Sequence, residues 1–149
     1  MENYLTVELG RKNISNNEVI IELGKSICPA EDILQNLEVG NIIELNKKAS
    51  SPADIFVKGQ LAAKAQIVSL QESIGVKIVE LFDESNNILN LTKDEIIMFD
   101  KEVPSYENFT CNVFSNNFLA AKGVIVVMND NFALRIVKTQ GTMEIQAGD

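Results

Sequence analysis

The chain contains one stretch twice, and this repetition decides the fold class. Residues Asp54–Val79 read DIFVKGQLAAKAQIVSLQESIGVKIV, and residues Asn112–Val137 read NVFSNNFLAAKGVIVVMNDNFALRIV, which aligns without a gap at an offset of 58. Nine of the 26 aligned positions are identical, against roughly two expected by chance from average composition. An internal repeat sets the architecture that every other motif must fit.

Each copy of the stretch predicts three β-strands joined by tight turns. The expected strands are 54–57, 61–70 and 74–81 in the first copy, and 109–114, 119–128 and 132–137 in the second. Residues 91–99 match residues 37–45 at an offset of 54, so one further strand precedes each set. The runs Leu61–Leu70 and Leu119–Met128 are apolar at consecutive positions, which is typical of strands covered on both faces.

A copy of this size does not bury a sufficient core alone, because units of about 60 residues rarely do. We therefore predict that the copies interlace about a pseudo-two-fold axis. The predicted fold is mainly β with one or two short helices, an intertwined pair resembling a β-barrel. The alternative, two separate beads on a string, is disfavoured by the short linker 82–87. The same contacts could form within one chain or between two chains in a swapped dimer, and the sequence leaves both open.

The region before the repeat adds two strands and a helix. Tyr4–Leu9 and Val19–Leu23 are expected strands, ended by turns at Gly10 and Gly24. Their sequences share the echo Glu-Leu-Gly-Arg/Lys, which is too short to establish a repeat. Between Ser26 and Leu37, the proline at 29 and the acidic residues after it predict a helix of about two turns. The expected domain plan is an N-terminal extension with a strand (1–18), a first copy (19–82), a diverged second copy (83–140), and a tail (141–149) with a short edge strand at 143–145.

Composition excludes several classes of function. The net charge of −8 and the pI near 4.6 disfavour nucleic acid and anionic membrane as partners, since both require a positive field. The chain has no histidine, which removes the commonest general base and zinc ligand. Cys28 and Cys111 lie among apolar residues and are interpreted as core residues in a reducing cytosol. The N-terminus does not resemble a signal peptide, and no apolar run is long enough to span a membrane.

Several short motifs, taken in order, resemble the SpoA domain family. They are LEVGNIIEL at Leu37–Leu45, PADIFVKG at Pro52–Gly59, and GVKI at Gly75–Ile78, with LGK at Leu23–Lys25 before them. This family supplies the C-terminal domains of the flagellar motor switch proteins FliN and FliM and of the cytoplasmic ring protein of type III secretion. The chain departs from the family pattern at Ala65-Gln66 and at Ser69, and the second copy matches more weakly.

The resemblance implies a non-enzymatic scaffold without cofactors, belonging to the cytoplasmic switch ring (C-ring) of the flagellar motor. Expected partners are FliM-like and FliN-like switch proteins and the regulator of the export ATPase, at the cytoplasmic face of the membrane. In FliN-like proteins a run of valines contributes to a hydrophobic docking patch. That run corresponds to Ile125, Val126 and Val127, and in the first copy to Ile67, Val68 and Ser69. These residues are equally candidates for core strand positions, and both interpretations can hold for alternate residues of one strand.

Three other functions remain as alternatives. Two copies in one chain also suit the ring protein of a type III secretion sorting platform. Glu84-Ser85-Asn86-Asn87 has the Glu-x-x-Asn spacing of motor-associated phosphatases, although the stretch is turn-like and the pattern is short. A dimerisation domain outside motility, including a homodimer of this chain, is the third.

Overall fold

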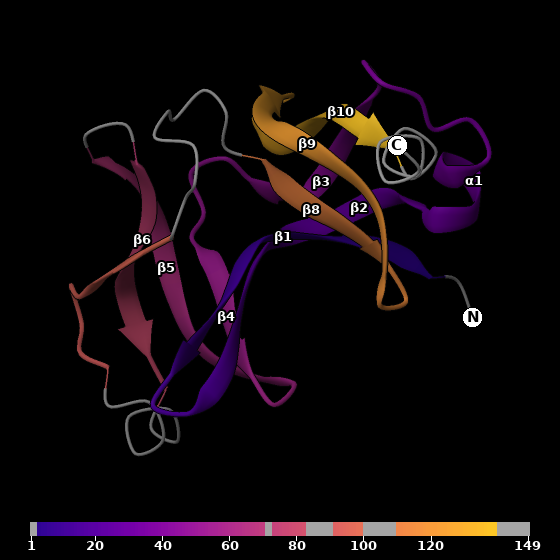
Figure 1. Ribbon diagram of the computed structural model, residues 1–149. Coiled ribbons are helices and arrows are strands. Elements are labelled where there is room, and N and C mark those ends of the chain that lie inside the picture. The colour runs from indigo at the N-terminus through magenta and orange to yellow at the C-terminus, as the bar shows by residue number, and fades with distance from the viewer. Residues whose placement is uncertain (1–2, 71–72, 83–90, 100–109, 140–149) are drawn as a thin grey trace. The chain divides into compact units, whose positions relative to one another are not determined.

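The computed structural model describes residues 3–70, 73–82, 91–99 and 110–139, which form ten strands and one short helix (Figure 1). The first half holds the helix and six strands: β1 (Tyr4–Ile14), β2 (Asn17–Pro29), α1 (Ala30–Leu34), β3 (Ile42–Lys48), β4 (Ala53–Val57), β5 (Gln60–Leu70) and β6 (Ser73–Leu81). The second half holds four: β7 (Ile96–Met98), β8 (Cys111–Ser115), β9 (Phe118–Met128) and β10 (Asn131–Thr139). The predicted mainly β fold class is confirmed.

The strands follow the order β1-β8-β9-β10-β3-β2-β4-β5-β6-β7, and an additional pairing joins β1 to β2. That additional pairing closes β1, β8, β9, β10, β3 and β2 into a ring of six strands, which fits the predicted resemblance to a barrel. Within this ring each strand has a neighbour on both sides, so its backbone groups are not left unpaired at an exposed sheet edge.

The chain divides into two compact units, and each unit contains strands from both halves of the sequence. Unit 1 comprises the residues up to Leu9, then Leu23–Ser50, then the residues from Thr110 onward. Unit 2 comprises Gly10–Glu22 and Ser51–Phe109. Unit 1 therefore combines β3 with β8, β9 and β10, whereas unit 2 combines β7 with β4, β5 and β6. This exchange of one strand is the intertwining that the apolar runs predicted.

Each unit has its own core of fully buried aliphatic side chains. Those of unit 1 include Leu5, Val7, Leu23, Leu45, Val113, Leu134 and Ile136, and those of unit 2 include Val19, Ile21, Ile55, Val76 and Ile78. Burying one such side chain contributes roughly 1.5–3 kcal/mol. Both cores draw on β1 or β2, which run through the two units in sequence.

The hairpins of the two repeated stretches have the same register. In β4–β5 the partners include Asp54–Lys64, Ile55–Ala63 and Phe56–Leu61, and in β8–β9 they include Asn112–Lys122, Val113–Ala121 and Phe114–Leu119. Every residue number differs by 58, and the irregularity between the second and third pair recurs in both hairpins. The β5–β6 and β9–β10 hairpins correspond in the same way, including the shift that follows Lys64 and Lys122.

The exchanged strands also pair in equivalent registers. In unit 1, β10 pairs with β3 through Ala133–Glu44, Leu134–Ile43 and Arg135–Ile42. In unit 2, β6 pairs with β7 through Gly75–Met98, Val76–Ile97 and Lys77–Ile96. The residues that precede these strands match as well, since Gly40 and Asp94 both have a positive φ and their N–H groups donate to the carbonyls of Ile136 and Ile78, each at 2.8 Å.

The echo between β1 and β2 has a structural counterpart. Val7 of β1 lies opposite Val113 of β8, and Ile21 of β2 lies opposite Ile55 of β4. Because Val113 and Ile55 are themselves equivalent, β1 and β2 occupy equivalent places at an offset of 14 residues. The short echo, which could not establish a repeat by itself, therefore reflects equivalent strand positions.

Two expectations about the N-terminal region were wrong. Gly10 and Gly24 do not end strands but lie inside β1 and β2, which continue to Ile14 and Pro29. An added Cβ would lie 3.0 Å from the ring of Phe99 at Gly10, and 3.3 Å from the Asn46 side chain at Gly24. These glycines allow close approach of a neighbour, which is the other use of glycine within a strand.

The helix was also overextended in the prediction. α1 has five residues, and the segment from Ser26 to Pro29 belongs to β2. Ser26 pairs with Leu45 of β3, and its hydroxyl accepts a hydrogen bond from the Leu5 N–H at 2.9 Å. Residues up to Pro29 therefore pair in the sheet, although their sequence also suits a helix. The helix begins directly after Pro29, whose missing N–H suits a helix start.

Candidate protein-interaction face

The three candidate residues of the second copy lie on β9, but they do not form one patch. Ile125 is opposite Leu134 and Val127 is opposite Phe132, whereas Val126 is opposite Ala133. Directly opposed residues of an antiparallel pair share a face of the sheet. Leu134 and Phe132 are buried in the core, so Ile125 and Val127 lie on the core side. Val126 shares the other face with Val124, which lies opposite the exposed Arg135, although Ala133 opposite Val126 is buried. Val127 is nevertheless 63% exposed, because it lies next to the end of its strand.

The candidate residues of the first copy lie on β5 with the same alternation. Ile67 is opposite Val76, a core residue of unit 2, and Val68 is opposite Gly75. Both side chains are half-buried. Ser69 is opposite Ile74 in the backbone pairing, and its side chain lies outside the described part of the structure.

The outward face of β9, β10 and β3 carries side chains that sequence reasoning did not single out. Its cross-strand rows are Val124–Arg135–Ile42, Val126–Ala133–Glu44 and Met128–Asn131–Lys48. Ile42 and Met128 are 48% and 40% exposed, and Val124 and Val126 are half-buried. We name these four apolar residues the β9 face; Ala133, between them, is buried. Strand alternation from Val126 would have identified Val124 and Met128, but Ile42 required the exchange of β3.

One end of this face is held by hydrogen bonds between distant segments. The Glu44 carboxylate accepts bonds from Asn131 Nδ2 at 2.8 Å and Asn129 Nδ2 at 3.3 Å. The Ala49 N–H donates to the carbonyl of Asp130 at 2.9 Å. Asn129 and Asp130 both have positive φ, as a two-residue type I′ hairpin turn requires. The turn between β9 and β10 is thus fixed to β3.

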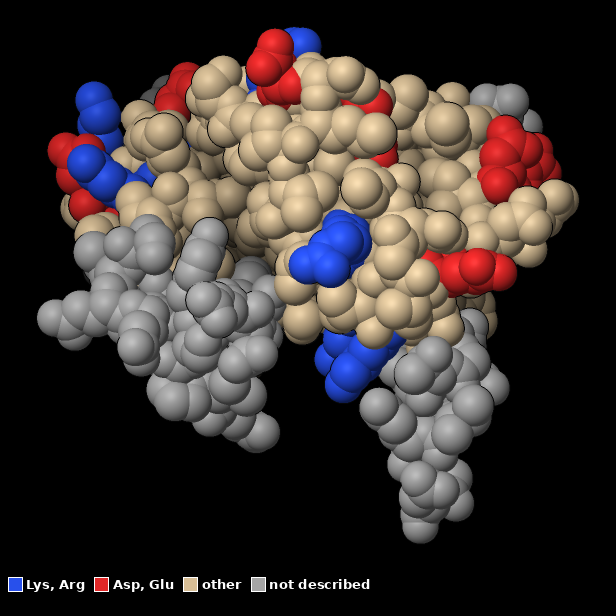
Figure 2. Space-filling model, turned by 90° about the horizontal axis from the view of Figure 1, so that it is seen from above, with Lys and Arg blue, Asp and Glu red and all other residues tan. Residues whose placement is uncertain are grey.

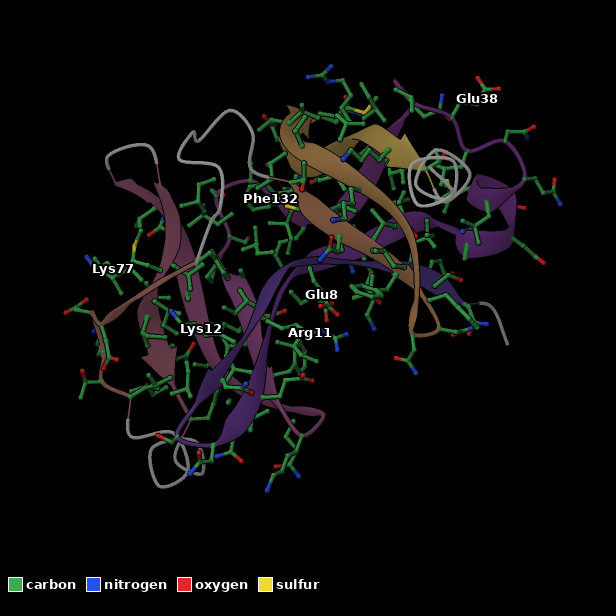
Figure 3. The ribbon with its side chains drawn as sticks, viewed as in Figure 1. Glu8, Arg11, Lys12, Glu38, Lys77 and Phe132 are labelled. Atoms are coloured by element: carbon green, nitrogen blue, oxygen red, sulfur yellow. The ribbon has the colours of Figure 1, made fainter. Side chains whose placement is uncertain are left out.

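The equivalent face of unit 2 keeps several apolar side chains, since Val68, Ile96 and Met98 stand at the positions of Val126, Ile42 and Glu44. Gln66 of β5 replaces Val124, and Lys77 of β6, labelled in Figure 3, replaces Arg135. The Lys77 ammonium lies 3.9 Å from the carboxylate of Asp94. Met98 of β7 has a backbone carbonyl that accepts a 2.6 Å hydrogen bond from Lys12 Nζ. The two faces therefore share a backbone plan but differ in chemistry.

Neither cysteine forms part of a reactive centre within the described residues. Cys111 is buried, and burial raises the pKa of its thiol to about 12, which suppresses the nucleophilic thiolate at neutral pH. Cys28 is exposed, so its prediction as a core residue was wrong. The end of β2 places it at the surface, next to the proline that starts α1. Among the same residues, no cluster of three or more cysteine or acidic side chains has the geometry to hold a metal ion.

Acidic and basic side chains are interspersed on the surface that Figure 2 shows, with uncharged residues between them. Within the described residues, no helix is both long and apolar enough to cross a membrane. The Glu84–Asn87 motif and the possible strand at 143–145 lie outside the described residues.

Comparison with known proteins shows which family residues 15–83 resemble. Residues 15–83 match the family described as type III flagellar switch regulator (C-ring) FliN C-term. The chain is 36% identical over 73 residues to the flagellar motor switch phosphatase FliY of Bacillus subtilis, covering 49% of this chain and 19% of that protein. It is 38% identical over 69 residues to the flagellar motor switch protein FliN of Borreliella burgdorferi, covering 46% and 60%.

A further relative, the flagellar motor switch protein FliN of Pseudomonas aeruginosa, is 30% identical over 73 residues, covering 49% of this chain and 46% of that protein. The chain thus spans less than two thirds of the length of each of these three relatives. The matched segment brackets the range 19–82 expected for the first copy. It confirms the resemblance to FliN-type domains that the motifs predicted. Residues 15–83 are therefore similar to the FliN C-terminal family.

Proposed function

We propose that this chain is a non-enzymatic structural component of the flagellar motor switch, where it docks other proteins in the cytoplasm at the base of the motor. The match of residues 15–83 to the FliN C-terminal family carries this proposal. The relatives named above are motor switch proteins. The proposed partners are FliM-like and FliN-like proteins of the switch ring and the regulator of the export ATPase.

We further propose that the chain holds two SpoA-like copies, at 19–82 and 83–140, after an N-terminal segment 1–18 and before a tail 141–149. Equivalent hairpin registers and the reciprocal exchange of β3 and β7 support this plan. A pair that is complete within one chain predicts a monomer. Size-exclusion chromatography with light scattering tests this, and a stable dimer would favour the swapped form.

The docking surface proposed here includes Val126 and the other residues of the β9 face, with Ile125 and Val127 contributing from the core side near the strand end. Ile67, Val68 and Ser69 form the corresponding, less apolar surface of the first copy. Exposed apolar side chains at neighbouring strand positions are a common feature of protein interfaces.

Copurification from cells tests the function directly. The tagged chain is expected to retain switch-ring proteins, and loss of the chain is expected to impair motility. Retention of a secretion ring or sorting platform in place of the switch ring would establish the type III secretion alternative. If neither apparatus associates with the chain, the proposal fails.

The phosphatase alternative has a separate test. The FliY alignment covers only 19% of that protein, so the name of the relative does not transfer an activity. Dephosphorylation of a phosphorylated response regulator is expected to be absent. Phosphatase activity that depends on Asn87, shown with Asn87→Ala, would contradict the non-enzymatic proposal.

A further inference from the structure

The β9 face differs in charge from its counterpart in unit 2, and the difference lies at equivalent positions. On β9 and β10, Lys122 lies directly opposite Lys138. On β5 and β6, the equivalent pair is Lys64 opposite Glu80. Opposite charges across a strand pair stabilise a sheet, and like charges directly opposed destabilise it. Unit 1 therefore carries an unfavourable pair where unit 2 carries a favourable one.

A second cation of the β9 face lacks the partner that its equivalent has. Lys77 lies 3.9 Å from Asp94, whereas the residue equivalent to Asp94 in unit 1 is Gly40, which carries no carboxylate to pair with Arg135. Among the residues that the structure describes, Lys122, Arg135 and Lys138 form no ion pair. Among the described residues of β3, β9 and β10, the carboxylate on this face is that of Glu44, which accepts hydrogen bonds from two asparagine amides.

These cations border the apolar residues of the β9 face. Arg135 lies between Val124 and Ile42 in one row, and the lysine pair forms the next row beyond the strand irregularity. At the other end of the β9 face, Lys48 lies in the same cross-strand row as Met128 and Asn131. A protein whose net charge is −8 thus has an apolar face bordered by positive charge. A local arrangement that costs stability without a structural gain is expected at functional sites.

We propose that the β9 face binds an acidic segment of a partner protein, one whose aliphatic or aromatic side chains alternate with carboxylates. The inference rests on the proposed docking function and specifies its partner. Apolar side chains of the segment would cover Ile42, Val124, Val126 and Met128. Its carboxylates would pair with Arg135, Lys122 and Lys138 and relieve their mutual repulsion. In unit 2, Glu80 lies opposite Lys64 and Asp94 lies near Lys77, so we expect the face of unit 2 to attract carboxylates less strongly.

Charge complementarity argues for this occupant over a basic one. The cations surround the apolar residues, so a basic segment would bring like charges together as it became buried, which is costly. The net negative charge of the chain repels an acidic segment elsewhere on the surface. The local cations therefore direct such a segment to the β9 face.

The test uses the full chain and two synthetic twelve-residue peptides with identical leucine and tryptophan positions. One peptide carries glutamate and the other lysine at every charged position. Titration followed by backbone amide NMR is expected to shift signals of β9, β10 and β3 with the glutamate peptide only. Its affinity is expected to fall when NaCl rises from about 50 mM to about 300 mM, because salt screens exposed charges.

Lys138→Glu is the decisive variant. It recreates in unit 1 the Lys–Glu pair of unit 2, so the fold should be as stable as the wild type or more stable. The same variant is expected to bind the glutamate peptide roughly two- to fivefold more weakly, the range for losing one exposed ion pair. Glu80→Lys, the reciprocal change in unit 2, is the matched control and should leave binding at the β9 face unchanged.

The outcomes separate this inference from the proposed function. Equal binding of the lysine peptide, absence of shifts on β9, β10 and β3 at 2 mM glutamate peptide, or unchanged affinity in Lys138→Glu would overturn the inference. Self-association of the chain through this face, seen by light scattering and reduced by Lys138→Glu, would also overturn it, since the occupant would be a second copy. Copurification of the wild type with switch-ring proteins would leave the proposed function standing in each case.

Discussion

Gly75→Ala is expected to destabilise unit 2, although its equivalent in unit 1 is an alanine. Gly75 of β6 lies opposite Met98 of β7. A Cβ at this position would lie 2.6 Å from the carbonyl oxygen of Ile97 and 2.7 Å from Met98 Sδ. The methionine side chain can move, but the carbonyl belongs to the strand pairing and cannot retreat without weakening it. The added methyl group therefore separates β6 from β7.

The magnitude follows from two opposing terms. Overpacking of a tight site costs typically about 1–3 kcal/mol. Replacing glycine by alanine recovers about 0.4–1 kcal/mol by restricting the unfolded chain. The expected net loss is roughly 1–2 kcal/mol. It should fall locally on β7, a strand of three residues, because a short strand at a sheet edge has few contacts to compensate.

Hydrogen exchange measured by NMR, together with urea unfolding, provides the assay. The N–H groups of Asp94 and Phe99 donate to Ile78 and Ile74 across the β6–β7 junction, at 2.8 Å and 3.2 Å. Their exchange is expected to accelerate about tenfold for each 1.4 kcal/mol lost. Ala133→Gly is the matched control in unit 1 and should leave both amides unchanged. A Gly75→Ala protein that is as stable as the wild type, with unaltered exchange at these amides, would refute the reasoning.

Three further predictions concern other contacts. Lys12→Met removes the 2.6 Å hydrogen bond from Lys12 Nζ to the carbonyl of Met98 and should cost about 1 kcal/mol in urea unfolding; an unchanged midpoint would contradict it. Glu44→Ala leaves the Asn129 and Asn131 amides without their carboxylate acceptor, so amide exchange in the β9–β10 turn should quicken, whereas Glu38→Ala should not affect it. Because burial raises the pKa of Cys111 from 9.0 to about 12, its protonated form favours folding, and this contribution to stability is present below pH 9.0 and declines as pH rises toward 12. Thiol titration at pH 8 should therefore detect Cys28 alone in the native protein and both cysteines after unfolding.

The sequence predicted most of the strands of the repeat because alternation, turn residues and duplication agreed there. It misplaced the strand ends at Gly10 and Gly24, where the glycine serves a contact with Phe99 or Asn46 from elsewhere in the chain. Local sequence carries no information about such a neighbour. The helix was overextended for a related reason, since Ser26 is committed to β3 by backbone pairing.

The candidate site was only partly predictable. The valine run directed attention to Val126, but consecutive strand residues alternate between faces, so Ile125 and Val127 belong to the core side. The remaining members of the β9 face come from β3 and β10. Ile42 reaches this face only because β3 pairs with a strand that begins some ninety residues later. A register between distant strands is set by the whole fold and cannot be read from either strand alone.

The presence of both halves in one chain allows the two faces to differ. In a symmetric dimer of identical chains, a substitution appears in both halves at once, so a cation pair that weakens one face weakens the other. Two similar halves within one chain escape this constraint. Gly75 and Ala133 illustrate this freedom. Gly75 lies opposite Met98 of β7, whereas the equivalent Ala133 lies opposite Glu44 of β3. Lys64–Glu80 and Lys122–Lys138 illustrate it for charge. One half can then place a carboxylate opposite a lysine while the other carries two opposed lysines, an asymmetry that the proposed binding face would use.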